Sequence, residues 1–163
     1  MSEYREHAAE LFGDKVYGEF LENLDAFAKK MDKTDFDDKT KEKYTNAIEE
    51  YYFHYGRARQ LEADFAVLSR DADRCNELYK NEPSDRKAEQ YKKQFYDIQR
   101  KLSNIKKHHE LAKEDMRICE GAAQTANISA EKRMAELEEQ RAQKNQNKKL
   151  KADDFSIIKP SKK

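Results

Sequence analysis

Apolar side chains recur along this chain with the spacing of a coiled coil. From Tyr44 to Tyr79, and again from Ala88 to Ala130, alternating steps of three and four residues meet no Lys, Arg, Asp or Glu. Since 40% of all residues are charged, chance would place several charges on runs of this length. A period of about 3.5 residues is that of supercoiled α-helices. The pattern therefore predicts two long helices and excludes disorder in both segments.

The break between these helices predicts how they are connected. Residues 81–84 read Asn-Glu-Pro-Ser and contain the only proline before residue 160. Proline lacks the amide donor that a helix interior needs, and only an antiparallel return fits so short a connection. The predicted fold class is therefore all-α: an elongated antiparallel coiled-coil hairpin over residues 36–143, with its turn near 81–84.

The position of the turn also suggests a register for the hairpin. Pairing the two runs about residues 81–84 sets Phe65 opposite Ile98 and places His54 and His109 in one layer. Such a polar core layer either fixes the register through a hydrogen bond or titrates near neutral pH. Two histidines alone make a poor zinc site, because structural zinc takes four ligands. We expect a structural layer, and we predict no metal and no cofactor.

Residues 1–31 are expected to form one or more further helices. One apolar stripe runs through Asp14–Met31, and Gly13 is a weak break before it; the stripe consists of Val16, Phe20, Leu24, Phe27 and Met31. The hairpin offers a matching surface in the aromatic run from Tyr51 to Tyr55. We expect the N-terminal helix to pack there, at the open end of the hairpin. The alternative is a helix of another chain, which would contact Tyr52, Phe53 and Tyr55.

Past Cys119 the second long helix extends beyond the end of the first, and the residues at its seam positions become small. Ala123, Ala126 and Ala130 follow one another on it, and Leu137 resumes it after Arg133. Alanine buries little apolar area, so this segment gains little stability by itself. It packs on the N-terminal helix or on a partner, and we favour a partner that binds these four residues.

The last twenty residues differ from the rest in charge. Residues 144–163 hold seven Lys and two Asp, so this segment carries +5 while the whole chain is neutral. The heptad pattern also ends near Gln143, which predicts a flexible basic tail. Within it, Phe155, Ile157 and Ile158 stand beside two acidic residues, a pattern typical of a short motif that fills a partner's groove.

A basic face is predicted on the outside of the second long helix. Arg86, Lys93, Arg100 and Lys107 recur every seven residues. Such a stripe is either a solvated outer surface or a site for an anionic membrane, in the manner of a BAR-type module. Nucleic-acid binding is disfavoured, because few aromatic residues accompany the basic ones.

No sequence pattern of catalysis is present. HExxH, GxSxG, CxxC and glycine-rich phosphate loops are all missing, so we predict that the chain is not an enzyme. The two cysteines fall on seam positions far apart, which favours a reducing intracellular compartment, most simply the cytoplasm, with the nucleus or cytoskeleton as alternatives. The residues resemble no family that we recognise.

The function predicted from the sequence is that of a structural or adaptor subunit of a hetero-oligomeric assembly. Its coiled-coil surfaces would bind helices of other protein chains. The alternative is a peripheral membrane-associated module that uses the basic face, with weak contact to anionic lipid.

Overall fold

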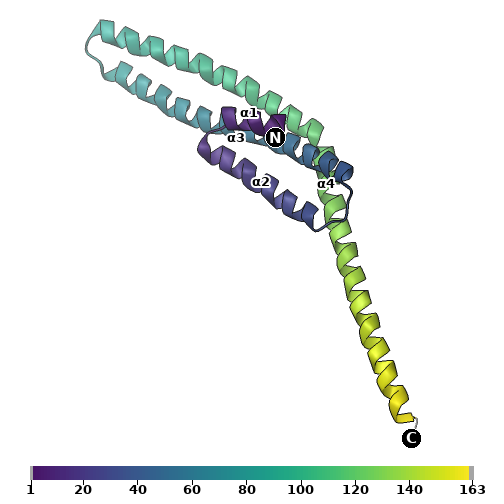
Figure 1. Ribbon diagram of the computed structural model, residues 1–163. Helices are drawn as coiled ribbons and strands as arrows, with labels where there is room; N and C mark the ends of the chain where they lie inside the picture. The colour runs from purple at the N-terminus through teal and green to yellow at the C-terminus, as the bar shows by residue number, and fades with distance from the viewer. Residues whose placement is uncertain (1, 162–163) are drawn as a thin grey trace.

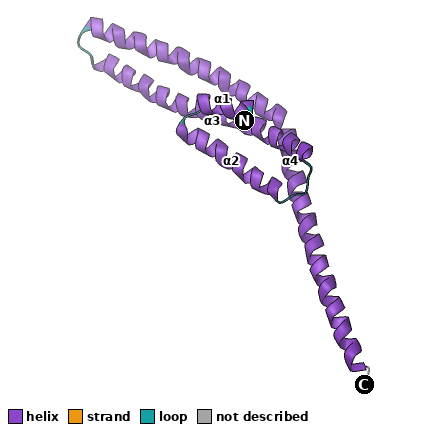
Figure 2. Cartoon of the chain, in the orientation of Figure 1, coloured by secondary structure: helices purple, strands orange, loops and turns teal. Residues whose placement is uncertain are grey.

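The structure is a computed structural model that describes the backbone of residues 2–161 and the side chains of residues 2–149. Over that range it consists of four helices and no strand: α1 (Glu3–Leu11), α2 (Asp14–Asp32), α3 (Asp38–Asn81) and α4 (Asp85–Ser161). α3 and α4 form a long antiparallel hairpin, and α1 and α2 lie along its open end (Figure 1; Figure 2). The predicted all-α hairpin with an N-terminal helical addition is confirmed.

The helix boundaries follow local capping chemistry. Ser2 caps α1 by accepting a hydrogen bond from the Arg5 amide at 3.2 Å, and Asp37 caps α3 by accepting one from the Thr40 amide at 2.7 Å. Side-chain acceptors at this position satisfy amides that have no partner within the helix. Gly13 precedes α2 in an extended conformation, so the weak break predicted there separates two helices.

α4 spans 77 residues, about 115 Å at ~1.5 Å per residue, and is far longer than its partner in the hairpin. It changes direction in its middle third, where it leaves α3 (Figure 1). In that region the Thr125 hydroxyl donates to the Gly121 carbonyl at 2.9 Å. A threonine hydroxyl bonded back to the preceding turn often bends a helix, and a glycine there offers little resistance.

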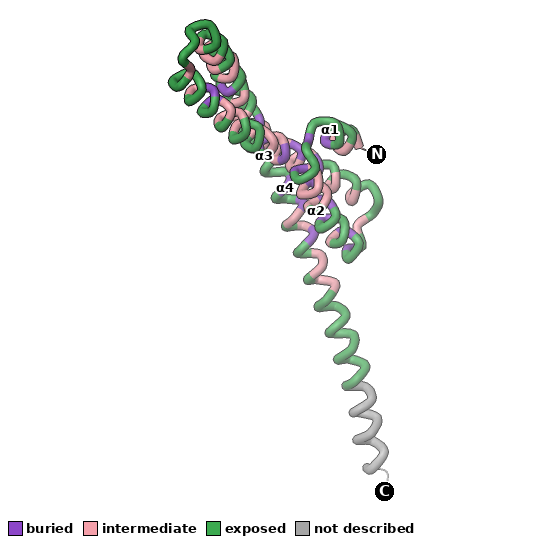
Figure 3. The backbone as a smooth tube through the Cα atoms, turned by 90° about the vertical axis from the view of Figure 1, so that its left-hand side faces the viewer, coloured by how far each residue is buried: buried purple, intermediate pink, exposed green. Residues whose placement is uncertain are grey.

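The main core lies where α1 and α2 cover the hairpin. Figure 3 shows buried residues concentrated there, while the hairpin end near the turn is mostly exposed or intermediate. The predicted stripe of α2 is buried along its whole length, and Ile48 of α3 is 1% exposed. Burial of each of these large side chains contributes about 1.5 to 3 kcal/mol. The N-terminal helices therefore stabilise one end of the hairpin only.

α4 continues past Gln143 to Ser161 without a break in the helix. The division into residues 1–31, 36–143 and 144–163 thus has no counterpart in secondary structure at its last boundary. The predicted flexibility of 144–163 stays a prediction, and the side chains of Phe155, Ile157 and Ile158 lie outside those that the structure describes.

Candidate functional site

The aromatic surface of α3 is covered by the chain's own α1. The ring of Phe53 is 5.4 Å from that of Tyr4 and 5.7 Å from that of Phe12, and only 7% of Phe53 is exposed. Gly56 makes this approach possible, since a Cβ atom there would lie 2.5 Å from the Phe12 ring. The expected packing of the N-terminal helices on this surface is therefore confirmed, and a contact of Phe53 with a partner stays a prediction.

The other two aromatic residues of this run are half-buried. Tyr52 packs against the core, and its ring lies 6.1 Å from that of Tyr55. α1 is also tied to α3 by an ion pair of 3.1 Å between Arg5 Nε and Glu49 Oε1. A contact of Tyr52 or Tyr55 with another chain stays a prediction.

The alanine seam of α4 is buried within the chain. Ala123 is 4% exposed, whereas Ala126 and Ala130 are fully buried in the core that α2 and α3 complete. Their small side chains allow α4 to lie close to α2, and a contact of these three residues with another chain stays a prediction. Leu137 is half-buried, and its role in binding stays a prediction.

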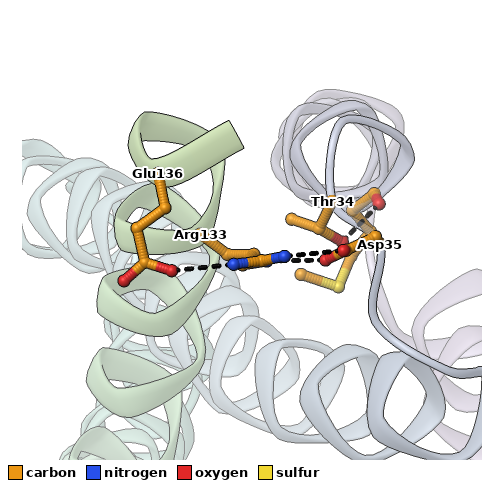
Figure 4. A network of polar contacts seen from close by, with 5 residues as sticks. Thr34, Asp35, Arg133 and Glu136 are labelled. Carbon is orange, nitrogen blue, oxygen red and sulfur yellow. Dashed lines mark hydrogen bonds and ion pairs between the residues drawn. The ribbon is translucent and has the colours of Figure 1, made fainter. Parts of the chain in front are cut away.

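Arg133, the charged residue that interrupts the seam, marks the edge of this core. Its Nε and second terminal nitrogen donate to the two oxygens of Asp35 at 2.6 and 2.7 Å, and its other terminal nitrogen donates to Glu136 at 2.9 Å (Figure 4). This bidentate contact holds the α2–α3 loop against α4. The hydrogen bond from Arg133 holds the pKa of Asp35 below its ordinary value.

The register of the hairpin differs from the predicted one. Phe65 lies under the Lys106 ammonium group, 5.8 Å from the ring centre, rather than beside Ile98. Likewise Arg57 pairs with Asp115 at 3.1 Å. Facing residues are thus displaced by about one heptad from the predicted pairs, and a shift of one heptad leaves both seams apolar.

The displacement separates the two histidines, so the predicted polar layer of His54 and His109 is wrong. His109 Nε2 lies 3.1 Å from Glu62. His54 instead lies near Asp115, six residues further along α4 than His109, or about 9 Å along the helix axis. Each imidazole therefore interacts with a carboxylate of the opposite helix.

Around His54 the register brings together a cluster that could hold a metal ion. One ligand atom each of Glu50, His54 and Cys119 lie within 4.8 Å of one another. His54 Nδ1 is 3.8 Å from Asp115 Oδ2 and 2.9 Å from a terminal nitrogen of Arg57. The predicted register missed this cluster, because it sets Cys119 one heptad away from Glu50.

Burial governs the proton affinities in this cluster. Desolvation, with the adjoining Glu50 carboxylate as the second cause, raises the pKa of the Cys119 thiol to about 11. Desolvation also lowers the pKa of His54, although Asp115 opposes that effect. Near neutral pH the cluster therefore holds a neutral thiol and a neutral imidazole beside two carboxylates, without the thiolate that a nucleophilic cysteine requires.

Beyond the end of α1 the hairpin carries an open groove of about 610 Å³. Leu61, Phe65 and Ile105 line it and are half-buried, with Glu62 and Lys106 at its edges. A smaller hollow beside it is lined by the last residues of α1. The groove thus begins where the N-terminal helices stop covering the hairpin. Two helices alone cannot enclose side chains of this size.

The predicted basic face is exposed to solvent. Arg86, Lys93, Arg100 and Lys107 are all exposed along α4. Arg100 forms an ion pair with Asp97 one turn earlier, which partly offsets the positive charge. In the part of the chain that the structure describes, no helix is both long and apolar enough to cross a membrane.

Comparison of the chain with protein-family models, with curated proteins and with solved structures finds no match. The function must therefore be argued from the chain's own groove, surfaces and side-chain clusters.

Proposed function

We propose that this chain is a non-catalytic structural or adaptor subunit that binds a helix of another protein chain. The observation that carries the proposal is the open groove at Leu61, Phe65 and Ile105. Grooves of this kind take the apolar face of an amphipathic helix, which anchors its side chains at intervals of three and four residues.

The chain's own N-terminal helices support this choice of occupant. α1 and α2 already cover the same hairpin with helical apolar stripes, and they stop beside the groove. A partner helix laid along Phe65 would continue the same mode of packing towards the turn. The charged groups at the edges of the groove, Glu62 and Lys106 among them, would then select the partner's orientation.

The proposal is tested by placing a photo-crosslinking phenylalanine analogue at one of two aromatic positions. Phe65 lies in the groove, whereas Tyr96 is 56% exposed beside Lys93 and Arg100 of the basic face. We expect the analogue at Phe65, and not at Tyr96, to capture one discrete protein in cells. The captured protein, once purified, should bind the unmodified chain, and an isolated helix from it should compete.

Three results would contradict the proposal: no adduct from position 65, adducts from both positions alike, or capture of a second copy of this chain. The membrane alternative is checked with anionic liposomes. Salt-sensitive co-sedimentation that is lost when Lys93 and Arg100 are replaced by glutamine would favour it over a protein partner.

A further inference from the structure

The strongest unassigned feature of the molecule is the side-chain cluster around His54. Its members come in two pairs, each separated by four residues: Glu50 and His54 on α3, and Asp115 and Cys119 on α4. Residues four apart lie on the same side of a helix. The antiparallel hairpin turns these two pairs towards each other, so that Glu50, His54 and Cys119 converge from two helices and Asp115 lies beside His54.

We propose that Glu50, His54, Asp115 and Cys119 bind a single Zn²⁺ ion between α3 and α4. In a tetrahedral zinc site the bonds are about 2.0 to 2.3 Å long, which puts neighbouring ligand atoms about 3.3 to 3.8 Å apart. The His54–Asp115 distance of 3.8 Å already meets this requirement. The ligand atoms of Glu50, His54 and Cys119, which lie within 4.8 Å of one another, need a contraction of about 1 Å. Asp115 is placed beside His54 alone, and rotation of its side chain, which is 44% exposed, would complete the site.

The chemistry of the donors selects the metal. A cysteine sulfur and an imidazole nitrogen favour zinc and its neighbours over Mg²⁺ or Ca²⁺, which take oxygen ligands. Cys119 is 8% exposed and His54 is half-buried, whereas the Asp115 side chain at the margin of the cluster is 44% exposed, so an ion can enter there. Two carboxylates beside it provide negative charge that a divalent cation neutralises.

Zn²⁺ binding exchanges a proton for the metal ion and involves no change of oxidation state. The metal replaces the proton on the Cys119 sulfur, and that proton leaves to solvent. His54 donates the lone pair of its neutral ring, and Glu50 and Asp115 each donate a carboxylate oxygen. One proton is released per ion bound, and zinc stays divalent throughout.

Arg57 competes for the same place. Its guanidinium lies 2.9 Å from His54 Nδ1 and 3.1 Å from Asp115 Oδ2, where it supplies the positive charge that the cluster otherwise lacks. The Arg57 side chain is 26% exposed, so it can swing into solvent when the metal enters. Arg57→Gln is therefore expected to bind zinc more tightly than the unchanged chain.

The test uses the full chain, kept reduced, with Co²⁺ as a spectroscopic substitute for Zn²⁺. One equivalent of Co²⁺ should produce a thiolate charge-transfer band and the visible bands of tetrahedral cobalt, and Zn²⁺ should abolish both. Cys119→Ser should lose the charge-transfer band. Cys75→Ser is the matched control, because Cys75 is also buried but lies near Gln94, away from the cluster.

A second pair of variants leaves both thiols in place. Glu50→Gln should weaken Zn²⁺ binding by more than about tenfold, whereas His109→Asn, which alters the other half-buried histidine, should leave it unchanged. Circular dichroism checks that each variant folds. If Cys119→Ser does not fold, the Zn²⁺ affinity of Glu50→Gln tests the proposal. Absence of the charge-transfer band in the unchanged chain would overturn the proposal. So would its persistence in Cys119→Ser, or equal loss in Cys75→Ser.

Discussion

Among single residues, Gly56 is the one whose missing side chain makes room for the segment that follows α1. A helix interior normally disfavours glycine by about 0.5 to 1 kcal/mol relative to alanine. Here the Phe12 ring occupies the space in which a side chain would stand. The cost to the intrinsic stability of α3 is thus offset by the close packing of α1.

Replacing Gly56 with alanine should therefore destabilise the protein, against the usual effect of this change. The new Cβ atom would lie 2.5 Å from a core aromatic ring, and overpacking of this kind costs about 1 to 3 kcal/mol. Gly18→Ala in α2 is the matched control, because nothing lies within 4 Å of its Cβ position and it should be neutral or stabilising. Urea unfolding compares the two. A Gly56→Ala chain as stable as Gly18→Ala would show that α1 does not pack there.

The contact between Asp35 and Arg133 should make stability depend on pH. Hydrogen bonding to Arg133 lowers the pKa of Asp35 from its ordinary 3.8. The ionised Asp35 carboxylate therefore contributes its full share of the folding stability above pH 3.8, and this share is lost as the pH falls through the lowered pKa. The stability difference between the unchanged chain and Asp35→Asn should be constant from neutral pH to about pH 5 and shrink below about pH 4. Urea midpoints measured across this range test it.

Asp97→Asn serves as the control, because the Asp97–Arg100 pair lies within one helix and joins no separate elements. It should change the midpoint less than Asp35→Asn at every pH. A difference for Asp35→Asn that does not vary with pH would show that its carboxylate is not the group involved.

At the scale of elements, the register of α3 against α4 determines which side chains meet. We predict that a short bis-maleimide joins cysteines at positions 62 and 109, since Glu62 and His109 contact each other at 3.1 Å. The pair Glu62→Cys with Lys101→Cys, which the sequence-derived register would bring together, should react poorly. Both pairs are made with Cys75 and Cys119 replaced by alanine. Efficient crosslinking of position 62 to position 101 instead would show that the register predicted from the sequence is the correct one.

The sequence predicted the hairpin, its turn and the buried stripe of α2, because each rests on local periodicity or on proline. It could not choose the register, because a heptad pattern matches itself when shifted by seven residues. The turn at Glu82–Ser84 lies about midway between the two candidate registers and favours neither. The Glu50–His54–Cys119 cluster was lost with that choice. The groove was missed for another reason: Phe65 and Ile105 sit on seam positions, yet two helices leave them half-exposed.

At the scale of the whole molecule, α4 contributes to the main core past Cys119, because Ala126 and Ala130 are part of that core. A chain ending at Gln143 should melt like the full-length protein. A chain ending at Ala123 loses Ala126, Ala130 and the Arg133 contact, and it uncovers part of α2. We expect a loss of about 3 kcal/mol, or a melting temperature lower by about 6 to 12 °C, measured by circular dichroism. Equal melting of both truncated chains would contradict the packing of α4 on α2.

One unbroken helix passes from the hairpin turn, through the covered core, to residues beyond Leu137. Each residue of an α-helix turns the chain by about 100°, so α4 fixes the rotational phase between the groove and any surface further along it. A single residue inserted after Gln143 would point everything beyond it in a new direction while leaving the core intact. Inserting seven residues would nearly restore the original direction of the side chains beyond that point and would move them about 10 Å further along the helix axis. The number of residues between two positions on α4 therefore sets both the distance and the relative direction of the surfaces at those positions.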